Sequence, residues 1–198
     1  LRAYGYIALR MLAQLSQKHT NLHDFFQQRE VNHVMVMVFS TDKGLCGGLN
    51  ANLSKKLVHF LEGFEKKYPK AKVDFAVSGK KAAEFLHRIG KNIELVFPAY
   101  SNNPKFSDIF PISKYALKGF LEKKYDQVLM IYPDFVSVIS QKPVVRPLLP
   151  FSVENFELMV EEIGSKFSKE VPVEKRDLEY KLEPSAEYII DNIVPQLT

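Results

Sequence analysis

The stretch VMVMVFSTDKGLCGGLNANL, residues 34–53, decides the fold of this 198-residue chain. Its first six residues form a continuous apolar run, which is typical of a strand buried on both faces of a sheet. A glycine-rich segment follows and leads into apolar residues at helical spacing, namely Leu53, Leu57, Phe60, Leu61 and Phe64. Residues 34–68 therefore predict a strand, a tight turn and an amphipathic helix that ends before Pro69.

A glycine-rich turn between a strand and a helix is a common place for phosphate binding, because backbone N–H groups converge at a helix N-terminus. A phosphate-binding P-loop ends in Lys followed by Ser or Thr, whereas here Leu49 and Asn50 follow the last glycine. The dinucleotide spacing G-x-G-x-x-G also fails, since the glycines fall at Gly44, Gly47 and Gly48. The loop thus occupies the place of a nucleotide site but lacks its residues.

The remaining sequence continues the alternation of strands and helices. We expect further strands at 73–77, 93–97 and 128–132, with helices at 79–90 and from 105 to 124 between them. The order strand–helix, repeated three times and closed by a strand, predicts an α/β, Rossmann-like and mostly parallel sheet with helices on both faces. Residues 136–140 and 144–149 follow too closely for a crossover helix, so they predict an antiparallel edge extension. Pro143 and Pro147 fit an edge because proline cannot donate to a ladder.

We expect one globular domain over residues 1–198. Within it we predict a helix over residues 1–17, an α/β core over 31–150, an exposed excursion over 151–184, and the start of a C-terminal helix over 185–198. Ser185 is a plausible N-cap of that last helix. Because the chain begins at Leu1, we interpret it as a piece of a longer protein.

Composition limits the classes of partner. Apolar residues make up 46% and charged residues 25%, which is typical of a globular domain. No apolar run reaches the roughly 18 to 20 residues of a membrane-spanning helix, so we expect no direct membrane insertion. The net charge of +4 comes with paired lysines on helices that have an apolar face, which favours solvated surfaces over a nucleic-acid site. The single cysteine, Cys46, excludes an internal disulfide and fits a reducing compartment.

An enzymatic alternative would use the loop after the first strand, because ligands of open parallel sheets bind past the carboxyl ends of the strands. Ser40, Thr41, Asp42 and Lys43 follow the first strand there, Ser78 the second and Asp134 the fourth. Asp42 could act as a nucleophile or metal ligand in a phosphoester- or nucleotide-binding enzyme. An aspartyl phosphatase would carry a second aspartate two positions on, where Gly44 stands. The competing interpretation is that Asp42 caps or braces the turn.

Two further candidates are weaker. Cys46 could be a nucleophile at a helix N-terminus, but no histidine is placed beside it by the sequence, and a small buried thiol is the favoured interpretation. His19 and His23 have the i, i+4 spacing of a zinc pair on a helix, yet no third ligand stands out. We therefore expect no catalytic residue, no cofactor and no metal.

Three sequence blocks resemble the gamma subunit of F-type ATP synthases. They are TDKGLCGGLN at residues 41–50, YPDFVSVISQKPVVRPLLP at 132–150, and EPSAEYIIDNIVPQL at 183–197. The resemblance marks the following residues as family signature and interface candidates: Asp42, Lys43, Gly44, Leu45, Cys46, Gly47, Gly48, Asn50, Tyr132, Phe135, Ser137 and Gln141.

The resemblance implies a role in a rotary motor. In that family the α/β domain is the foot of the central stalk, a non-catalytic rotor subunit that couples rotation of the membrane c ring to ATP synthesis. It implies contacts of the foot with the epsilon subunit and the c ring, and contacts with the alpha and beta catalytic subunits through long helices that this chain mostly lacks. The implied location is the cytoplasmic face of the bacterial inner membrane or an equivalent coupling membrane.

Overall fold

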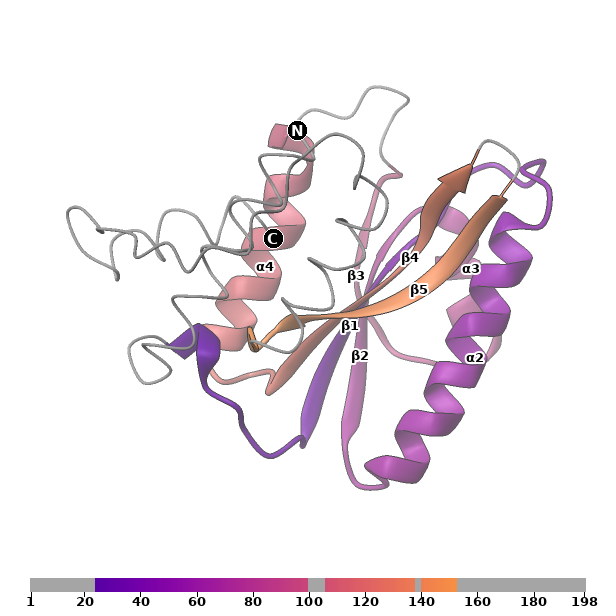
Figure 1. Ribbon diagram of the computed structural model, residues 1–198. Helices are drawn as coiled ribbons and strands as arrows, with labels where there is room; N and C mark the ends of the chain where they lie inside the picture. The colour runs from indigo at the N-terminus through magenta and orange to yellow at the C-terminus, as the bar shows by residue number, and fades with distance from the viewer. Residues whose placement is uncertain (1–23, 100–105, 138–139, 153–198) are drawn as a thin grey trace, which may run out of the picture. The chain divides into compact units, whose positions relative to one another are not determined.

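The computed structural model describes residues 24–99, 106–137 and 140–152, which contain a five-stranded sheet with three α-helices and one 3-10 turn (Figure 1). The elements are η1 (Asp24–Phe26), β1 (His33–Phe39), α2 (Leu49–Lys67), β2 (Lys72–Ser78), α3 (Lys80–Arg88), β3 (Ile93–Phe97), α4 (Phe106–Leu121), β4 (Gln127–Ser137) and β5 (Ser140–Leu149). The strand order is β3-β2-β1-β4-β5. β1 pairs in parallel with β2 and β4, β2 pairs in parallel with β3, and only β5 is antiparallel. The predicted mostly parallel sheet with an antiparallel edge is confirmed.

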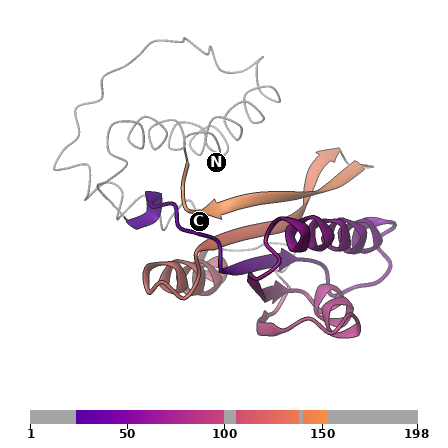
Figure 2. The ribbon, with the colours of Figure 1, turned by 90° about the horizontal axis from the view of Figure 1, so that it is seen from below.

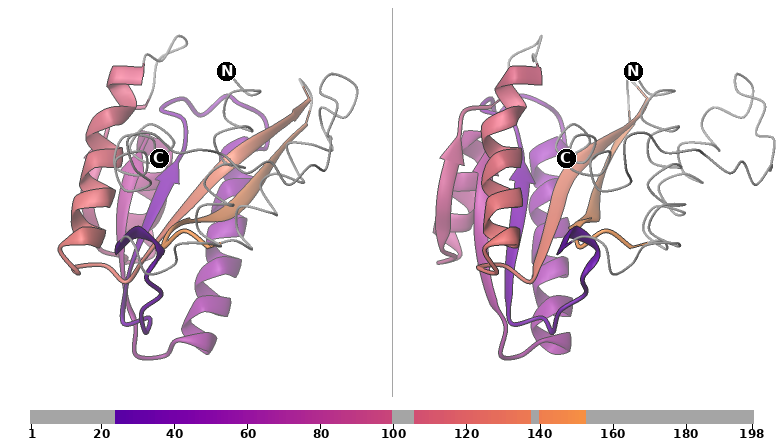
Figure 3. Two further views of the ribbon diagram at one scale, coloured as in Figure 1. Left: turned by 60° about the vertical axis from the view of Figure 1, so that its left-hand side comes forward. Right: turned by 90° about the vertical axis from the view of Figure 1, so that its left-hand side faces the viewer.

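The helices cover both faces of the sheet. α2 and α3 lie on one side and α4 lies on the other (Figures 2 and 3). Val34, Val36 and Val38 of β1 join the buried cluster beneath α2 and α3. Side chains alternate across a strand, so Met35 and Met37 point to the α4 face, and they are also buried. The apolar run is thus buried on both faces of the sheet over residues 34–38, as its composition predicts, and its last residue, Phe39, is partly buried.

α2 carries the predicted apolar stripe. Leu53, Leu57, Leu61 and Phe64 are buried, and Phe60 is partly buried against the same cluster. The helix ends at Lys67, because the next residue, Tyr68, has a non-helical backbone conformation. The Tyr68 N–H still makes the last bond of the helix and donates to Phe64 O at 2.8 Å. Pro69 follows directly, which agrees with the predicted end of this helix.

Three boundary predictions were wrong. The helical spacing of the sequence also predicts that Ile89 and Leu121 face inward, but they are 37% and 39% exposed. α3 already ends at Arg88 before a turn in which Gly90 has φ +68°, and α4 ends at Leu121 before a turn in which Lys123 has φ +60°. β4 runs to Ser137 instead of ending near residue 132, because β5 pairs with it along the whole hairpin.

The chain divides into two compact units, and residues 28–149 form the one that contains the sheet. The described part of the other unit comprises residues 24–27 and 150–152, where Phe151 N donates to Phe25 O at 2.8 Å and the rings of Phe25, Phe26 and Phe151 pack together. The predicted segments 1–17 and 185–198, and the excursion from residue 153 to 184, lie outside the described residues. The expectation of one domain over residues 1–198 therefore stays a prediction.

Candidate docking site at the carboxyl end of the sheet

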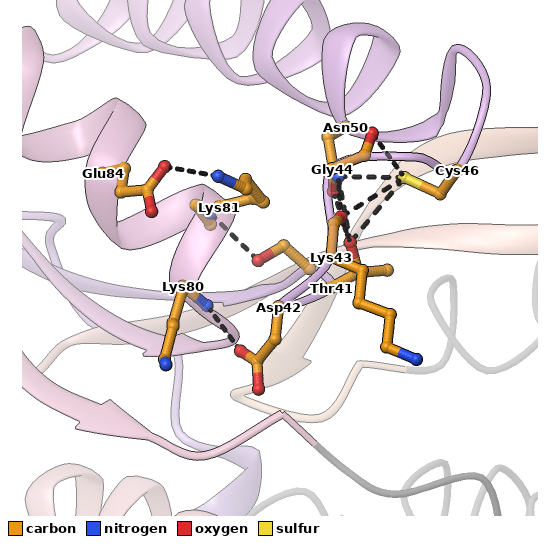
Figure 4. A network of polar contacts seen from close by, with 11 residues as sticks. Thr41, Asp42, Lys43, Gly44, Cys46, Asn50, Lys80, Lys81 and Glu84 are labelled. Carbon is orange, nitrogen blue, oxygen red and sulfur yellow. Dashed lines mark hydrogen bonds and ion pairs between the residues drawn. The ribbon is translucent and has the colours of Figure 1, made fainter.

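The β1–α2 loop, residues 40–48, leaves the carboxyl end of β1 and caps the neighbouring helix α3 (Figure 4). Three successive backbone N–H groups in the first turn of α3 donate to it. The acceptors are Asp42 Oδ1 for Lys80 at 2.9 Å, Thr41 O for Lys81 at 3.2 Å, and Ser40 Oγ for Ala82 at 3.0 Å. Because a helix lacks internal partners for its first N–H groups, these contacts satisfy donors that would otherwise be free to bind an anion.

The start of the loop lies against the turn between β2 and α3. Ser40 N donates to Ser78 O at 2.8 Å, and Ser40 Oγ donates to the same carbonyl at 3.2 Å. Gly79 has φ +96°, and a Cβ added there would lie 2.4 Å from Ser40 O. Only glycine fits both this backbone conformation and this close approach. Ser40 and Asp42 therefore have structural partners at the positions where the enzymatic alternative placed reactive groups.

The second half of the loop is held by Asn50, the second residue of α2. Its Nδ2 atom donates to Thr41 Oγ1 at 2.9 Å, to Lys43 O at 3.1 Å and to Cys46 Sγ at 3.0 Å. The Thr41 hydroxyl lies 2.7 Å from Lys43 O as a donor and 3.7 Å from Cys46 Sγ. Cys46 is partly exposed and belongs to this small network, so the predicted buried thiol is buried only in part.

Apolar side chains are exposed at this end of the sheet. Leu45 in the loop has a relative exposure of 105%, and Phe135 and Val136 on β4 are 51% and 48% exposed. β1 pairs with β4 only as far as Val38 and Ile131, so β4 continues past the last paired residue of β1 toward the side on which the loop lies (Figure 1). Each of these exposed apolar side chains is a candidate contact with another protein.

The other signature residues stabilise the β4–β5 hairpin. Tyr132 OH accepts a hydrogen bond from Arg146 Nε at 2.9 Å, and Gln141 Nε2 donates to Ser137 O at 3.3 Å. Asp134, which the enzymatic alternative placed at the end of the fourth strand, lies within β4 opposite Lys142 in the antiparallel register. Ser78 is buried and donates to Pro98 O at 3.0 Å. The structure thus divides the candidates between the loop and the hairpin.

The loop encloses little space for a ligand. A cavity of about 10 Å³ lies between the loop, α2 and α3, lined by Ser40, Asn50, Ser54, Lys81 and neighbouring apolar side chains. That volume suits one water molecule and not a nucleotide. Across residues 24–99, 106–137 and 140–152, no three His, Cys, Asp or Glu side chains gather in a way that could hold a metal ion. His19 and His23 lie outside these ranges.

A second polar cluster, which sequence reasoning missed, lies at the amino end of the strands. His33 Nε2 lies 2.7 Å from Asp74 Oδ2, and the His33 ring meets the Tyr125 ring edge-on at 4.9 Å. Tyr125 is fully buried, with its OH 3.5 Å from Asp74 Oδ2. Burial raises the pKa of Tyr125 above its usual range, because the phenolate would lose its hydration. No sequence motif marks these residues, since they come from separate strands and a turn.

The chain resembles proteins of one family over its whole length. A family model described as ATP synthase matches residues 1–198. The ATP synthase gamma chain of Chlorobaculum parvum is 34% identical over 200 residues, a match that covers 98% of this chain and 63% of that relative. The gamma chain of one strain of Dehalococcoides mccartyi is 31% identical over 188 residues, covering 93% of this chain and 58% of the relative. The chain thus spans about three fifths of the length of the curated relatives it matches.

Among solved structures, the chain resembles one from the central stalk and c ring of the Tetrahymena thermophila mitochondrial ATP synthase. The TM-score is 0.55 at 17% identity, and the match covers 99% of this chain and 85% of that one. At this identity the likeness supports the fold alone. No described helix has the combination of length and apolar character needed to cross a bilayer. Because the family model matches every residue from 1 to 198, the chain belongs to the ATP synthase gamma chain family.

Proposed function

We propose that this chain is the foot of the central stalk in a proton-transporting F-type ATP synthase, where it couples rotation of the c ring to ATP synthesis. The observation that carries this proposal is the difference between the polar and the apolar side chains of the β1–α2 loop and the start of α2. Its polar side chains Asp42 and Asn50 bind other parts of the same fold, while Leu45 is left fully exposed. That arrangement suits a contact surface better than a catalytic centre.

The proposed subunit is not itself catalytic. Asp42 is exposed and has a structural role, because its Oδ1 atom accepts the Lys80 N–H at 2.9 Å and so caps α3. The neighbouring cavity of about 10 Å³ also offers no room for a phosphoester. These two observations favour the rotor over the phosphoester- or nucleotide-binding alternative.

A rotor foot has to be stiff. A five-stranded sheet whose central strand β1 is buried on both faces resists bending, because close-packed interiors cannot deform continuously. The hydrogen bonds from the first turn of α3 to the β1–α2 loop add to this stiffness at the carboxyl end of the sheet. Torque applied to such a body would pass through it with little loss to internal motion.

The proposed partners are the epsilon subunit and the c ring at the foot, and the alpha and beta catalytic subunits through helices of the complete rotor. Support comes from the names of the relatives and from the c ring that the Tetrahymena structure includes. The proposed location is peripheral, on the cytoplasmic face of a bacterial inner membrane or an equivalent coupling membrane. The apolar residues Leu45, Phe135 and Val136 are the proposed contact points.

Co-elution with purified partners tests this proposal. The chain is mixed with the cognate epsilon subunit and detergent-solubilised c ring and passed over a sizing column, where we expect one complex. In parallel, MgATP, MgGTP and p-nitrophenyl phosphate are added in thermal-shift assays, where we expect no rise in melting temperature. Co-elution without ligand stabilisation supports the rotor. Turnover of any of these compounds that is lost in Asp42→Asn would support the enzyme instead.

A further inference from the structure

We infer that Asn50 is the positioning residue of the β1–α2 loop, because its side-chain amide fixes the turn that presents Leu45. This role rests on the proposed docking function and gives Asn50 an internal task, in place of direct contact with a partner. The sequence marked Asn50 only as one member of a signature. Its hydrogen bonds distinguish it from the other members.

The amide joins both sides of Leu45. Two N–H groups on Asn50 Nδ2 are shared among three acceptors, Thr41 Oγ1 at 2.9 Å, Lys43 O at 3.1 Å and Cys46 Sγ at 3.0 Å. Thr41 and Lys43 precede Leu45, and Cys46 follows it. One side chain therefore closes the turn from Lys43 to Cys46 around the exposed leucine.

Besides the Asn50 bonds, the loop has the Thr41 hydroxyl bond to Lys43 O at 2.7 Å and the backbone bond from Cys46 N to Gly44 O at 3.0 Å. Neither of these two bonds reaches α2. Leu45 is fully exposed, so its own packing cannot hold the turn. Gly44, Gly47 and Gly48 add backbone freedom, and Gly47 has φ +60°. Without the Asn50 bonds, a partner would have to order this segment on binding, and that ordering lowers affinity.

Asn50 can act as a clamp because it stands on a rigid element. It lies in the first turn of α2, whose next turns bury Leu53 and Leu57 beneath the helix. The other end of the loop is tied to α3 through Asp42 and Ser40. The exposed turn is thus held between two packed helices, and Asn50 provides the contact on the α2 side.

The chain supplies a matched control in Asn52. It is the same residue type on the same helix, exposed, and its side chain makes no hydrogen bond within the described part of the chain. Asn50→Ala and Asn52→Ala therefore make the same chemical change on one helix. Only the first removes the clamp.

Amide hydrogen exchange of the isolated chain tests the clamp directly. We expect exchange of the Cys46 N–H, which donates to Gly44 O at 3.0 Å within the turn, to quicken at least about tenfold in Asn50→Ala and to stay unchanged in Asn52→Ala, with the midpoint of global urea unfolding nearly constant in both. Unchanged exchange of the Cys46 N–H in Asn50→Ala would overturn the inference. This measurement needs no partner, so its outcome does not depend on the proposed function.

A double-mutant cycle tests the link to Leu45, using affinity for the cognate epsilon subunit bound to the c ring. We expect Leu45→Ala to weaken binding about tenfold, Asn50→Ala to weaken it several-fold, and the double variant to match Leu45→Ala alone. Fully additive effects, or wild-type affinity in Leu45→Ala, would overturn the role of Asn50 in presenting Leu45. If the unaltered chain binds neither partner, the proposed function fails, and the exchange measurement alone decides whether Asn50 clamps the turn.

Discussion

The Asp42 carboxylate accepts a 2.9 Å hydrogen bond from the backbone N–H of Lys80, so a loop that follows one strand caps the helix that follows the next. The two residues are separated by 38 positions in the sequence. A capping side chain usually precedes its own helix, and here Gly79 stands in that place with no side chain to offer. The loop thereby becomes part of the packed α/β unit.

Replacing Asp42 tests its capping role. Asp42→Ala removes an acceptor from an α3 N–H group and should lower the free energy of unfolding by about 1 kcal/mol in urea titrations. Asp42→Asn keeps a side-chain oxygen in place and should stay within a few tenths of a kcal/mol of the unaltered chain. Equal destabilisation by both substitutions would mean that the negative charge of Asp42 stabilises the fold and that its hydrogen bond from the Lys80 N–H does not.

Gly79 should tolerate no side chain. Gly79→Ala places a Cβ 2.4 Å from Ser40 O at φ +96°, so the β1–α2 loop must shift and the variant should lose more than about 2 kcal/mol of unfolding free energy. Gly90→Ala is the control, because φ is +68° there but no atom lies within 4 Å of the added Cβ. Gly90→Ala should lower the free energy of unfolding by only about 1 kcal/mol, because the positive φ angle alone opposes the added Cβ. Similar losses in the two variants would show that contact with Ser40 is unimportant.

Stability should fall at high pH through Tyr125. Burial raises the pKa of Tyr125, while the same phenol in the unfolded chain ionises near its usual pKa of about 10. Above that pH the unfolded state loses a proton that the folded state keeps, so the free energy of unfolding decreases as pH rises. The contribution of Tyr125 to the free energy of unfolding is fully present below about pH 10, where the phenol is protonated in both states.

Phenylalanine at this position should remove that loss. Between pH 9 and pH 11, roughly the range around the usual tyrosine pKa, Tyr125→Phe should lose less unfolding free energy than the unaltered chain in urea titrations. An identical pH slope in Tyr125→Phe would assign the alkaline sensitivity to other groups.

Much of the fold could be predicted because it is encoded locally. The run at residues 34–39 and the stripe Leu53, Leu57, Leu61 and Phe64 are periodic patterns, and each gave the correct element and the correct buried side. The ends of elements were less predictable. Ile89 and Leu121 continue the helical spacing, but positive φ angles at Gly90 and Lys123 belong to turns that end the helices first.

The candidate site was located by sequence, but its internal chemistry was not. The signature string placed the loop at the carboxyl end of β1, and the idea that Asp42 braces a turn was correct in kind. Its partner could not be named, because Lys80 is brought beside it only by the pairing of β1 with β2. Asn50 was missed as a clamp for a similar reason, since a hydrogen-bond pattern depends on the conformation of the turn and not on residue order.

Titration calorimetry tests most directly whether the carboxyl end of the sheet is a docking surface. The chain is titrated into the cognate epsilon subunit bound to the c ring, with Leu45→Asp compared with Val58→Asp, a change at a 38% exposed residue on α2. We predict that Leu45→Asp weakens binding at least about tenfold and that Val58→Asp leaves it unchanged. Wild-type affinity in Leu45→Asp would contradict the account, as would binding of MgATP by the chain alone.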